Sequence, residues 1–219
     1  MAAFSMSAPK PRTIVYVDGF NFYYGVVKNT GYKWLDFERY FTRLRANDDI
    51  RRIKYFTALV EPGAHRVRQE TFLAALQTRP LIETILGRFK RKRVTCMYPA
   101  CTTTGLGDRV FDVPEEKRTD VNIAIHMLDD AYQGSCEQQV LVSGDSDLVP
   151  ALQMVRHRFP AIRTVVYVPA RTQTRGRAFE LRQAAHRHRD LPLTLLAKAQ
   201  FPIRVADGAG GFVEKPAEW

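Results

Sequence analysis

The sequence is poor in cysteine and contains no long apolar run. Cys96, Cys101 and Cys136 are an odd number at low density in 219 residues, which argues against a disulfide scaffold and favours a reducing, cytoplasmic compartment. No apolar run approaches the ~20 residues of a membrane-spanning helix, so no membrane association is expected. Residues 1–11 lack the apolar segment of a signal peptide and are expected to form a flexible leader.

Several signatures of nucleotide and cofactor sites are also missing. No Gly-x-Gly-x-x-Gly follows a predicted strand, and no P-loop Gly-Lys-Ser/Thr occurs. No Asp-x-Asp follows the first predicted strand, so an aspartyl-phosphate mechanism lacks its nucleophile and acid pair. A cofactor-dependent oxidoreductase and a phosphatase of that type are therefore less favoured.

Positive charge is in excess: 33 basic residues stand against 23 acidic ones, a net charge of +10. A basic surface attracts polyanions through counterion release, which favours nucleic acid as a partner. Simple solubility is the alternative explanation of the same charge. Apolar residues make up 45% of the chain, enough for one domain with a sizeable core.

Short β-branched runs alternate with amphipathic stretches along the chain. This alternation predicts βαβ units and a single three-layer α/β domain with a mostly parallel central sheet flanked by helices. The domain is expected over residues 12–200, followed by a tail over 201–219 whose glycine-rich part, 207–219, should fray. The expected strands are residues 13–17, 52–60, 89–98, 139–143, 163–168 and 193–196. The expected helices are residues 20–28, 35–45, 66–77 with a continuation over 80–86, 119–132, 146–159 and 177–186. Residues 101–114 are expected to form a loop.

The helix over residues 119–132 has a clear apolar periodicity. Val121, Ile125, Leu128 and Tyr132 recur at helical spacing, so they are expected to face the core.

Two acidic segments are predicted to follow strands at one edge of the sheet. In an open parallel sheet, ligands bind beyond the carboxyl ends of the strands. Asp18 ends the first strand, and Asn21 follows in the first turn of a helix. The alternative is that Asp18 only caps a turn.

The second acidic segment follows the strand over residues 139–143. Gly144 permits a tight turn, and Asp145 and Asp147 follow it; Ser143 and Ser146, beside them, are expected to contact a substrate. A helix N-terminus explains one acidic residue well, because its dipole favours negative charge, but it explains two less well.

A third acidic position opens the helix over residues 119–132. Asp120 lies in its first turn, after Lys117 and Arg118, which form either a surface ion-pair cluster or a grip on phosphate. Carboxylates that converge repel one another and favour a bound cation. Mg²⁺ or Mn²⁺ suits such oxygen ligands, and either ion can promote phosphodiester hydrolysis.

Two further basic segments are candidates for phosphate contacts. The run from Arg88 to Arg93 suits either phosphate binding or a charged, solvated edge strand. Arg171, Arg175 and Arg177 follow the strand over residues 163–168 and are preferred, because they should lie at the rim of the site. Phe20, Phe22, Tyr23 and Tyr24 suit the core better than base stacking.

Three blocks of the sequence resemble those of the NYN domain family, which includes LabA-like proteins and belongs with the PIN-like metal-dependent ribonucleases. The blocks are Val15–Asn21, Lys117–Val121 and Val142–Leu148, and the resemblance extends over about residues 12–196. It implies a ribonuclease dependent on Mg²⁺ or Mn²⁺, with RNA favoured over DNA. The implied metal ligands and catalytic residues are Asp18, Asp120, Asp145 and Asp147, with Asn21 as a polar helper.

His126 departs from the family pattern, because many relatives carry an aspartate there. A structural histidine is favoured over a polar group beside the site, and Asp129 and Asp130 are expected to be solvated. Two alternatives stay open: a non-catalytic or regulatory RNA-binding module of the same fold, and another Mg²⁺-dependent phosphoryl-transfer enzyme. The sequence also leaves open whether the chain forms a homo-oligomer.

Overall fold

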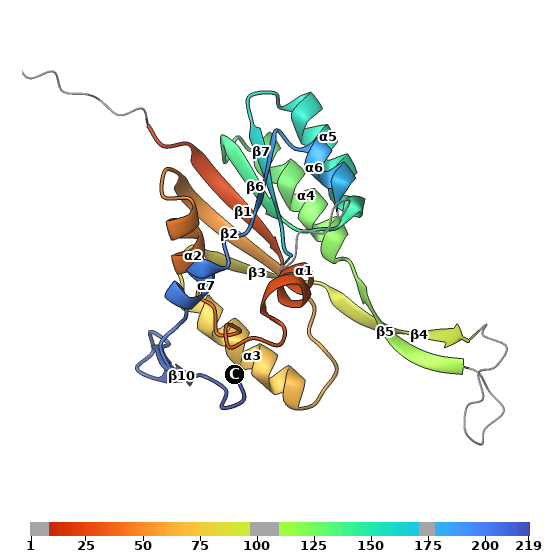
Figure 1. Cartoon of the computed structure of the whole chain (residues 1–219), viewed down its shortest axis with the longest axis vertical. Helices are drawn as coiled ribbons and strands as arrows, with labels where there is room; N and C mark the ends of the chain where they lie inside the picture. Colours follow the sequence, from red (N-terminus) through yellow and green to blue (C-terminus); the bar gives the residue numbers. More distant parts are fainter. Residues whose placement is uncertain (1–8, 97–109, 171–177) are drawn as a thin grey trace, which may run out of the picture.

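The computed structural model describes residues 9–96, 110–170 and 178–219. Its centre is a six-stranded parallel sheet in the order β3-β2-β1-β6-β7-β8, shown in Figure 1. The predicted α/β class with a parallel sheet is confirmed. The strands of this sheet are β1 (Arg12–Asp18), β2 (Asp49–Thr57), β3 (Ile82–Leu86), β6 (Gln138–Val142), β7 (Arg163–Val168) and β8 (Arg187–Asp190).

Helices cover both faces of the sheet (Figure 1). One face carries α2 (Phe37–Leu44), α3 (Ala64–Gln77) and α7 (Thr194–Lys198), and the other carries α4 (Thr119–Tyr132), α5 (Val149–Arg158) and α6 (Phe179–Ala184). Short helical segments follow β1 and β6. After β1, α1 (Gly19–Phe22) continues into the π-helix η1 (Tyr23–Val27); after β6, the 3-10 helix η2 (Ser146–Leu148) precedes α5. In the described ranges, no helix has the length and apolar character that a membrane crossing requires.

The alternation of side chains along β1 divides the interior into two cores. Val15 and Val17 point to the α2–α3 side, where an aromatic cluster includes Trp34. Ile14 and Tyr16 point to the other side, against Ile123 and Met127 of α4 and their neighbours. Because both faces of β1 are covered, its sequence is a continuous apolar run, as expected for a central parallel strand.

Several expected elements were wrong. Residues 82–86 form strand β3, not a continuation of the preceding helix, because they pair with the free edge of β2. Residues 194–198 form a helical turn, not a strand. Residues 110–114 belong to β5 (Val110–Lys117) rather than to a loop.

The expected third strand is present as β4 (Arg88–Thr95), but it lies outside the main sheet. It pairs with β5 alone, in an antiparallel two-stranded ribbon that projects from the body of the molecule (Figure 1).

The apolar face expected for α4 was also wrong. Val121, Ile125 and Tyr132 are exposed, whereas Ile123 and Met127 face the sheet. Ile123, Met127 and Ala131 recur at i, i+4 and i+8 and form the apolar stripe that packs on the sheet. Asp130 lies on the same face, where it finds a partner on β2.

That partner is Lys54, whose Nζ donates to both carboxylate oxygens of Asp130 at 2.9 and 2.8 Å. The Tyr16 hydroxyl donates to the same carboxylate at 2.7 Å, and His126 Nδ1 lies 3.1 Å from Lys54 Nζ. Asp130 is therefore buried rather than solvated, whereas Asp129 is exposed as expected. His126 contacts Lys54 beside the buried ion pair, as expected for a histidine with a structural role.

The C-terminal residues do not fray. They form a hairpin of β9 (Arg204–Ala206) and β10 (Phe212–Glu214), and the Trp219 ring packs 6.2 Å from Trp34 and 5.8 Å from Phe72, centroid to centroid. Burial of aromatic area outweighs the flexibility of the glycines in this segment.

Replacing Asp130 by asparagine should destabilise the fold strongly. The change leaves the buried Lys54 ammonium without a counter-ion, which costs about 3–5 kcal/mol of the free energy of unfolding. Urea denaturation measures this loss. Asp129→Asn, on the exposed side of the same helix, is the control and should change stability by less than about 0.5 kcal/mol. Equal losses in the two variants would contradict a stabilising role for the pair.

Candidate active site

The candidate site lies where the strand order reverses. From β1 the chain proceeds through β2 to β3 on one side, and later places β6, β7 and β8 on the other. Loops that leave the carboxyl ends of β1 and β6 therefore diverge, and the crevice between them is the usual ligand position in open α/β sheets. Asp18 ends β1, and Ser143 follows β6.

Asp18 is buried and held by three hydrogen bonds. It caps α1, and its Oδ1 accepts from the Asn21 backbone N–H at 2.9 Å. Its Oδ2 accepts from Asn21 Nδ2 at 2.6 Å and from the Ser143 hydroxyl at 2.9 Å. Burial raises the pKa of Asp18, while these hydrogen bonds lower it and the charge of Asp145 raises it further. The carboxylate is fixed in position before any ligand binds.

The segment after β6 is tied to the segment after β1. The Gly144 N–H donates to Asn21 Oδ1 at 3.2 Å, and the Asp145 N–H donates to the Ser143 hydroxyl oxygen at 3.1 Å. Asp145 Oδ1 in turn accepts from the Asp147 N–H at 3.0 Å. Asn21 and Ser143 therefore link the two acidic segments through Asp18.

Asp120 joins this neighbourhood from the first turn of α4. Its pKa is raised to about 6, first by burial and then by the negative charges of Asp145, Asp18 and Asp147. Carboxylates from three separate segments therefore lie close enough for the charge of one to raise the pKa of another.

Glu116 is a fifth acidic group, which the sequence reasoning missed. It is the penultimate residue of β5, and it accepts a hydrogen bond from the Thr119 hydroxyl. Its pKa is raised to about 7 by burial and by the charges of Asp18 and Asp120, against the opposing effect of the Thr119 bond. Its position four residues before Asp120 was the available signal, but no strand was predicted there, so nothing indicated that its side chain would reach the site.

The residues present fit a divalent cation. The acidic side chains offer only oxygen ligands, which Mg²⁺ and Mn²⁺ prefer. A cation would also relieve the mutual repulsion that, after burial, raises the pKa values of Glu116 and Asp120. Within residues 9–96, 110–170 and 178–219, no three acidic, histidine or cysteine side chains already converge on one point at metal-ligand distance. The exposed Asp147 and the half-buried Asp145 and Asp120 would therefore have to adjust around an ion.

The other candidate residues lie around this cluster. Ser146 is exposed, and Lys117 forms a 2.9 Å ion pair with Glu115 at the surface. Arg118 is exposed too, with a left-handed backbone (φ 80°) that turns the chain from β5 into α4. Arg171, Arg175 and Arg177 lie outside the described residues.

Of the four aromatic side chains that were expected to suit the core, Phe22 alone is buried, so this expectation holds only in part. Phe22 is buried and packs against Phe37, whereas Tyr24 is exposed. Phe20 contacts Phe89 at the base of the β4–β5 ribbon, with ring centroids 5.5 Å apart.

A doubly wound parallel sheet with carboxylates at its switch point is the architecture of a PIN-like nuclease fold. The family model described as NYN domain matches residues 12–193, and the chain belongs to the NYN domain family of the PIN-like nuclease superfamily. The resemblance seen in the three sequence blocks is thereby confirmed.

Two known proteins illustrate the relationship. The chain is 33% identical to the 6-hydroxy-3-succinoylpyridine 3-monooxygenase HspA of Pseudomonas putida (strain DSM 28022 / S16), over 95% of this chain and 75% of that protein. A crystal structure of a protein of unknown function from Vibrio parahaemolyticus RIMD 2210633 matches 85% of this chain and 96% of its own length, with a TM-score of 0.50 and 16% identity. At that identity, the second match shows the fold alone.

The acidic cluster should make metal-free stability depend on pH. The raised pKa values of Glu116, about 7, and Asp120, about 6, mean that the folded state retains protons that the unfolded state releases. Their stabilising contribution is full below about pH 4 and is lost as the pH rises through about 6 to 7. Relative to a Glu116→Gln/Asp120→Asn variant, the protein in EDTA should therefore show a Tm that falls between pH 5 and pH 8.

Mg²⁺ or Mn²⁺ should raise the Tm more at pH 8 than at pH 5, because protons compete with the cation for the same carboxylates. Calorimetry with and without the ion measures both effects. Identical pH slopes in the protein and its double variant would contradict the electrostatic coupling.

Proposed function

We propose that this chain is a metal-dependent ribonuclease that hydrolyses phosphodiester bonds at the switch point between β1 and β6. The observation that carries the proposal is the geometry by which Asn21 and Ser143 hold the Asp18 and Asp145 segments together at the ends of β1 and β6, with Asp120 near enough for their charges to raise its pKa. These residues come from distant parts of the chain, and bringing their carboxylates together costs free energy because like charges repel. Such clusters are typical of sites that bind a cation or carry out a reaction. Membership of a nuclease-like family supports the same conclusion.

Each acidic residue would have its own part in the site. Asp18, fixed by Asn21 and Ser143, gives the cation one immobile ligand. Asp120, Asp145 and Asp147 supply the remaining protein oxygens. When bound, Mg²⁺ or Mn²⁺ polarises a phosphoryl oxygen and lowers the pKa of coordinated water.

Glu116 is suited to proton transfer. A carboxyl group with a pKa of about 7 exchanges protons readily at neutral pH, which is the condition for efficient general acid–base catalysis. Its Oε1 accepts from Thr119, which leaves Oε2 to take a proton from a water or to return one to a leaving oxygen. We place Lys117, Arg118 and Ser146 on the substrate side of the site, because they are exposed beside it.

RNA is the favoured substrate because of the family resemblance, and the net charge of +10 suits any nucleic acid. A non-catalytic RNA-binding module of the same fold would keep this charge without needing the acidic set. Another Mg²⁺-dependent phosphoryl-transfer enzyme would need the acidic set but not a long polyanionic substrate.

Hydroxylation of a pyridine is a second candidate, favoured by the 33% identity to a protein named as a monooxygenase. A monooxygenase requires dioxygen and a source of two electrons. Non-haem iron oxygenases commonly hold their metal with two histidines and a carboxylate. His126, the histidine on the helix that carries Asp120, contacts Lys54 instead of the acidic cluster, which makes this candidate the weaker one.

Purified protein should cleave RNA in the presence of Mg²⁺ or Mn²⁺ and lose this activity in EDTA. Asp18→Asn and Asp145→Asn should each lower the rate by at least ~100-fold, because each removes a charged ligand from the reacting centre. Gel electrophoresis of end-labelled RNA measures cleavage. Asp129→Asn, exposed on α4 away from the cluster, is the control and should keep full activity.

Cleavage that survives EDTA, or that is unchanged in Asp145→Asn, would contradict the mechanism. Tight RNA binding without cleavage under both metals would instead support the binding module.

The hydroxylase candidate has a separate test. The protein is incubated with 6-hydroxy-3-succinoylpyridine, dioxygen and NADH, and substrate consumption is followed by mass spectrometry. We expect no consumption by a preparation that cleaves RNA. Turnover of the pyridine by that preparation, lost in Asp145→Asn, would show that the acidic site serves the relative's named reaction.

A further inference from the structure

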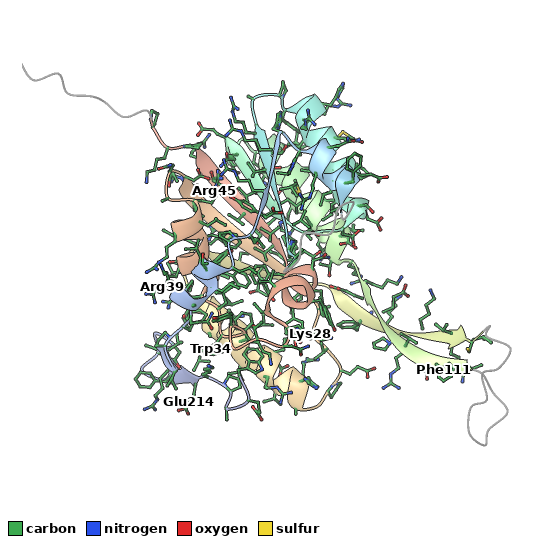
Figure 2. The ribbon with its side chains drawn as sticks, viewed as in Figure 1. Lys28, Trp34, Arg39, Arg45, Phe111 and Glu214 are labelled. Carbon is green, nitrogen blue, oxygen red and sulfur yellow. The ribbon has the colours of Figure 1, made fainter. Side chains whose placement is uncertain are left out.

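The β4–β5 ribbon is a structural feature that the proposed hydrolysis does not use. Its strands of eight residues each span about 26 Å and pair only with each other among the described elements. Figure 2 shows Phe111 near the outer end of the ribbon, away from the body of the molecule. Such an exposed ribbon contributes little to the core, so its sequence invites a functional explanation.

The two faces of the ribbon differ in charge. Side chains alternate along a strand, and directly paired residues share a face. One face, which we call the anchored face, carries Phe89, Arg91 and Arg93 from β4. Phe89 packs against Phe20, Arg91 Nε donates to Glu61 Oε1 at 2.7 Å, and Arg93 lies 3.9 Å from Asp112. On this face the charges of Arg91 and Arg93 are offset by Glu61, by Asp112 and by Glu116, which is paired with Phe89, although both arginines remain exposed.

The opposite face is strongly basic, and we call it the cationic face. Its charged members are exposed except for one partly exposed glutamate, Glu115, which Lys92 and Lys117 share at 3.7 and 2.9 Å. Among the described residues, neither Arg88 nor Lys90 has an ion-pair partner. The face therefore keeps a clear excess of positive charge. Its members are Arg88, Lys90 and Lys92 on β4 and Glu115 and Lys117 on β5.

The row of cations begins beside the acidic site. Arg88 pairs with Lys117 at the base of the ribbon, and Lys117 precedes Asp120 by three residues, at most about 11 Å along the chain. Arg88, Lys90 and Lys92 then continue outward at intervals of about 6.6 Å, since alternate residues of a strand face the same way.

Apolar side chains complete the cationic face at its outer end. Val113 is the cross-strand partner of Lys92, and the pair of Val94 and Phe111 lies beyond it; the three are 44%, 39% and 41% exposed. A line of positive charge that ends in an exposed aromatic ring matches the chemistry of an unpaired nucleic-acid strand, whose backbone is anionic and whose bases stack on aromatic side chains. Duplex RNA fits less well, because its bases are not free to stack.

We propose that the cationic face of the β4–β5 ribbon binds the sugar–phosphate backbone of an unpaired RNA strand and leads that strand to the acidic site. The proposal rests on the proposed function for the identity of the polymer. The ribbon acts as an arm: its anchored face fixes it to α1 and to the segment that carries Glu61, and its cationic face holds phosphates.

Binding of a fluorescent single-stranded RNA in EDTA, over a series of salt concentrations, tests the proposal without cleavage. In the variant Arg88→Ser/Lys90→Ser/Lys92→Ser, affinity near 0.1 M salt should fall roughly 10- to 100-fold, and the slope of log K against log salt should decrease by about 2. The control Arg158→Ser/Arg163→Ser/Lys198→Ser removes three exposed cations away from the ribbon and should bind like the unaltered protein. Unchanged Tm values would show that both variants fold.

Phe111→Leu tests the assignment to an unpaired strand. It keeps an apolar side chain but removes the aromatic face, so binding of single-stranded RNA should weaken at least about fivefold with no change in salt slope. Duplex RNA and single-stranded DNA of equal length complete the comparison. Unchanged binding in Phe111→Leu, or tighter binding of the duplex, would overturn the assignment.

The outcomes separate this inference from the proposed hydrolysis. Loss of binding in the ribbon variant, without RNA cleavage under any metal, would support the arm while the hydrolysis fails. Cleavage by a protein whose ribbon variant binds RNA as well as before would overturn the arm while the hydrolysis stands. Equal loss in the control variant, or no binding by the unaltered protein, would also overturn the arm.

Discussion

The buried Asp18 carboxylate is the contact on which the rest of the site depends. It lies at the end of β1, caps the turn that follows, and accepts the Ser143 hydroxyl from the segment after β6. Because Asn21 bonds both Asp18 and the Gly144 amide, the two halves of the doubly wound sheet are joined at the point where they diverge. A carboxylate in this position loses most of its hydration, so its hydrogen bonds are what keep it ordered.

Two acidic residues of α4, the buried Asp130 and the half-buried Asp120, differ in how the loss of hydration of their carboxylates is compensated. The charge of Asp130 is balanced by Lys54, and its carboxylate also accepts a hydrogen bond from the Tyr16 hydroxyl, on the face of the helix that meets the sheet. Asp120, in the first turn of the same helix, is half-buried near the negative charges of Asp145, Asp18 and Asp147, and burial together with these charges raises its pKa. The ion pair of Asp130 with Lys54 helps to hold α4 on the sheet, and α4 carries Asp120 at the site in its first turn. The Lys54–Asp130 pair therefore stabilises the same helix that carries Asp120 in an unfavourable electrostatic environment, and groups with shifted pKa values of this kind are common in active sites.

The β4–β5 ribbon extends the molecule beyond this site. It projects from the body of the molecule (Figure 1); β5 itself carries Glu116, and α4, which follows it, carries Asp120 in its first turn. A basic ribbon that continues directly into an acidic site suits a polymer substrate, because contacts along the polymer can position the bond that is to react. The exposed Val121 and Ile125 on α4 are a second surface feature, beside an exposed Tyr132 whose ring packs against Phe159.

The sequence by itself determined the parallel α/β class, the family and the segments that carry Asp18, Asp120 and Asp145, because buried parallel strands are continuous apolar runs and turns at their ends have local signatures. Only the tertiary structure decided the pairing of β3, the place of β4 outside the sheet, the buried face of α4 and the presence of Glu116 in the site. The physical reason is the same for each: strand partners, ion pairs such as Lys54–Asp130, and the desolvation of a carboxylate depend on residues that are distant in sequence. Local patterns contain no information about those partners.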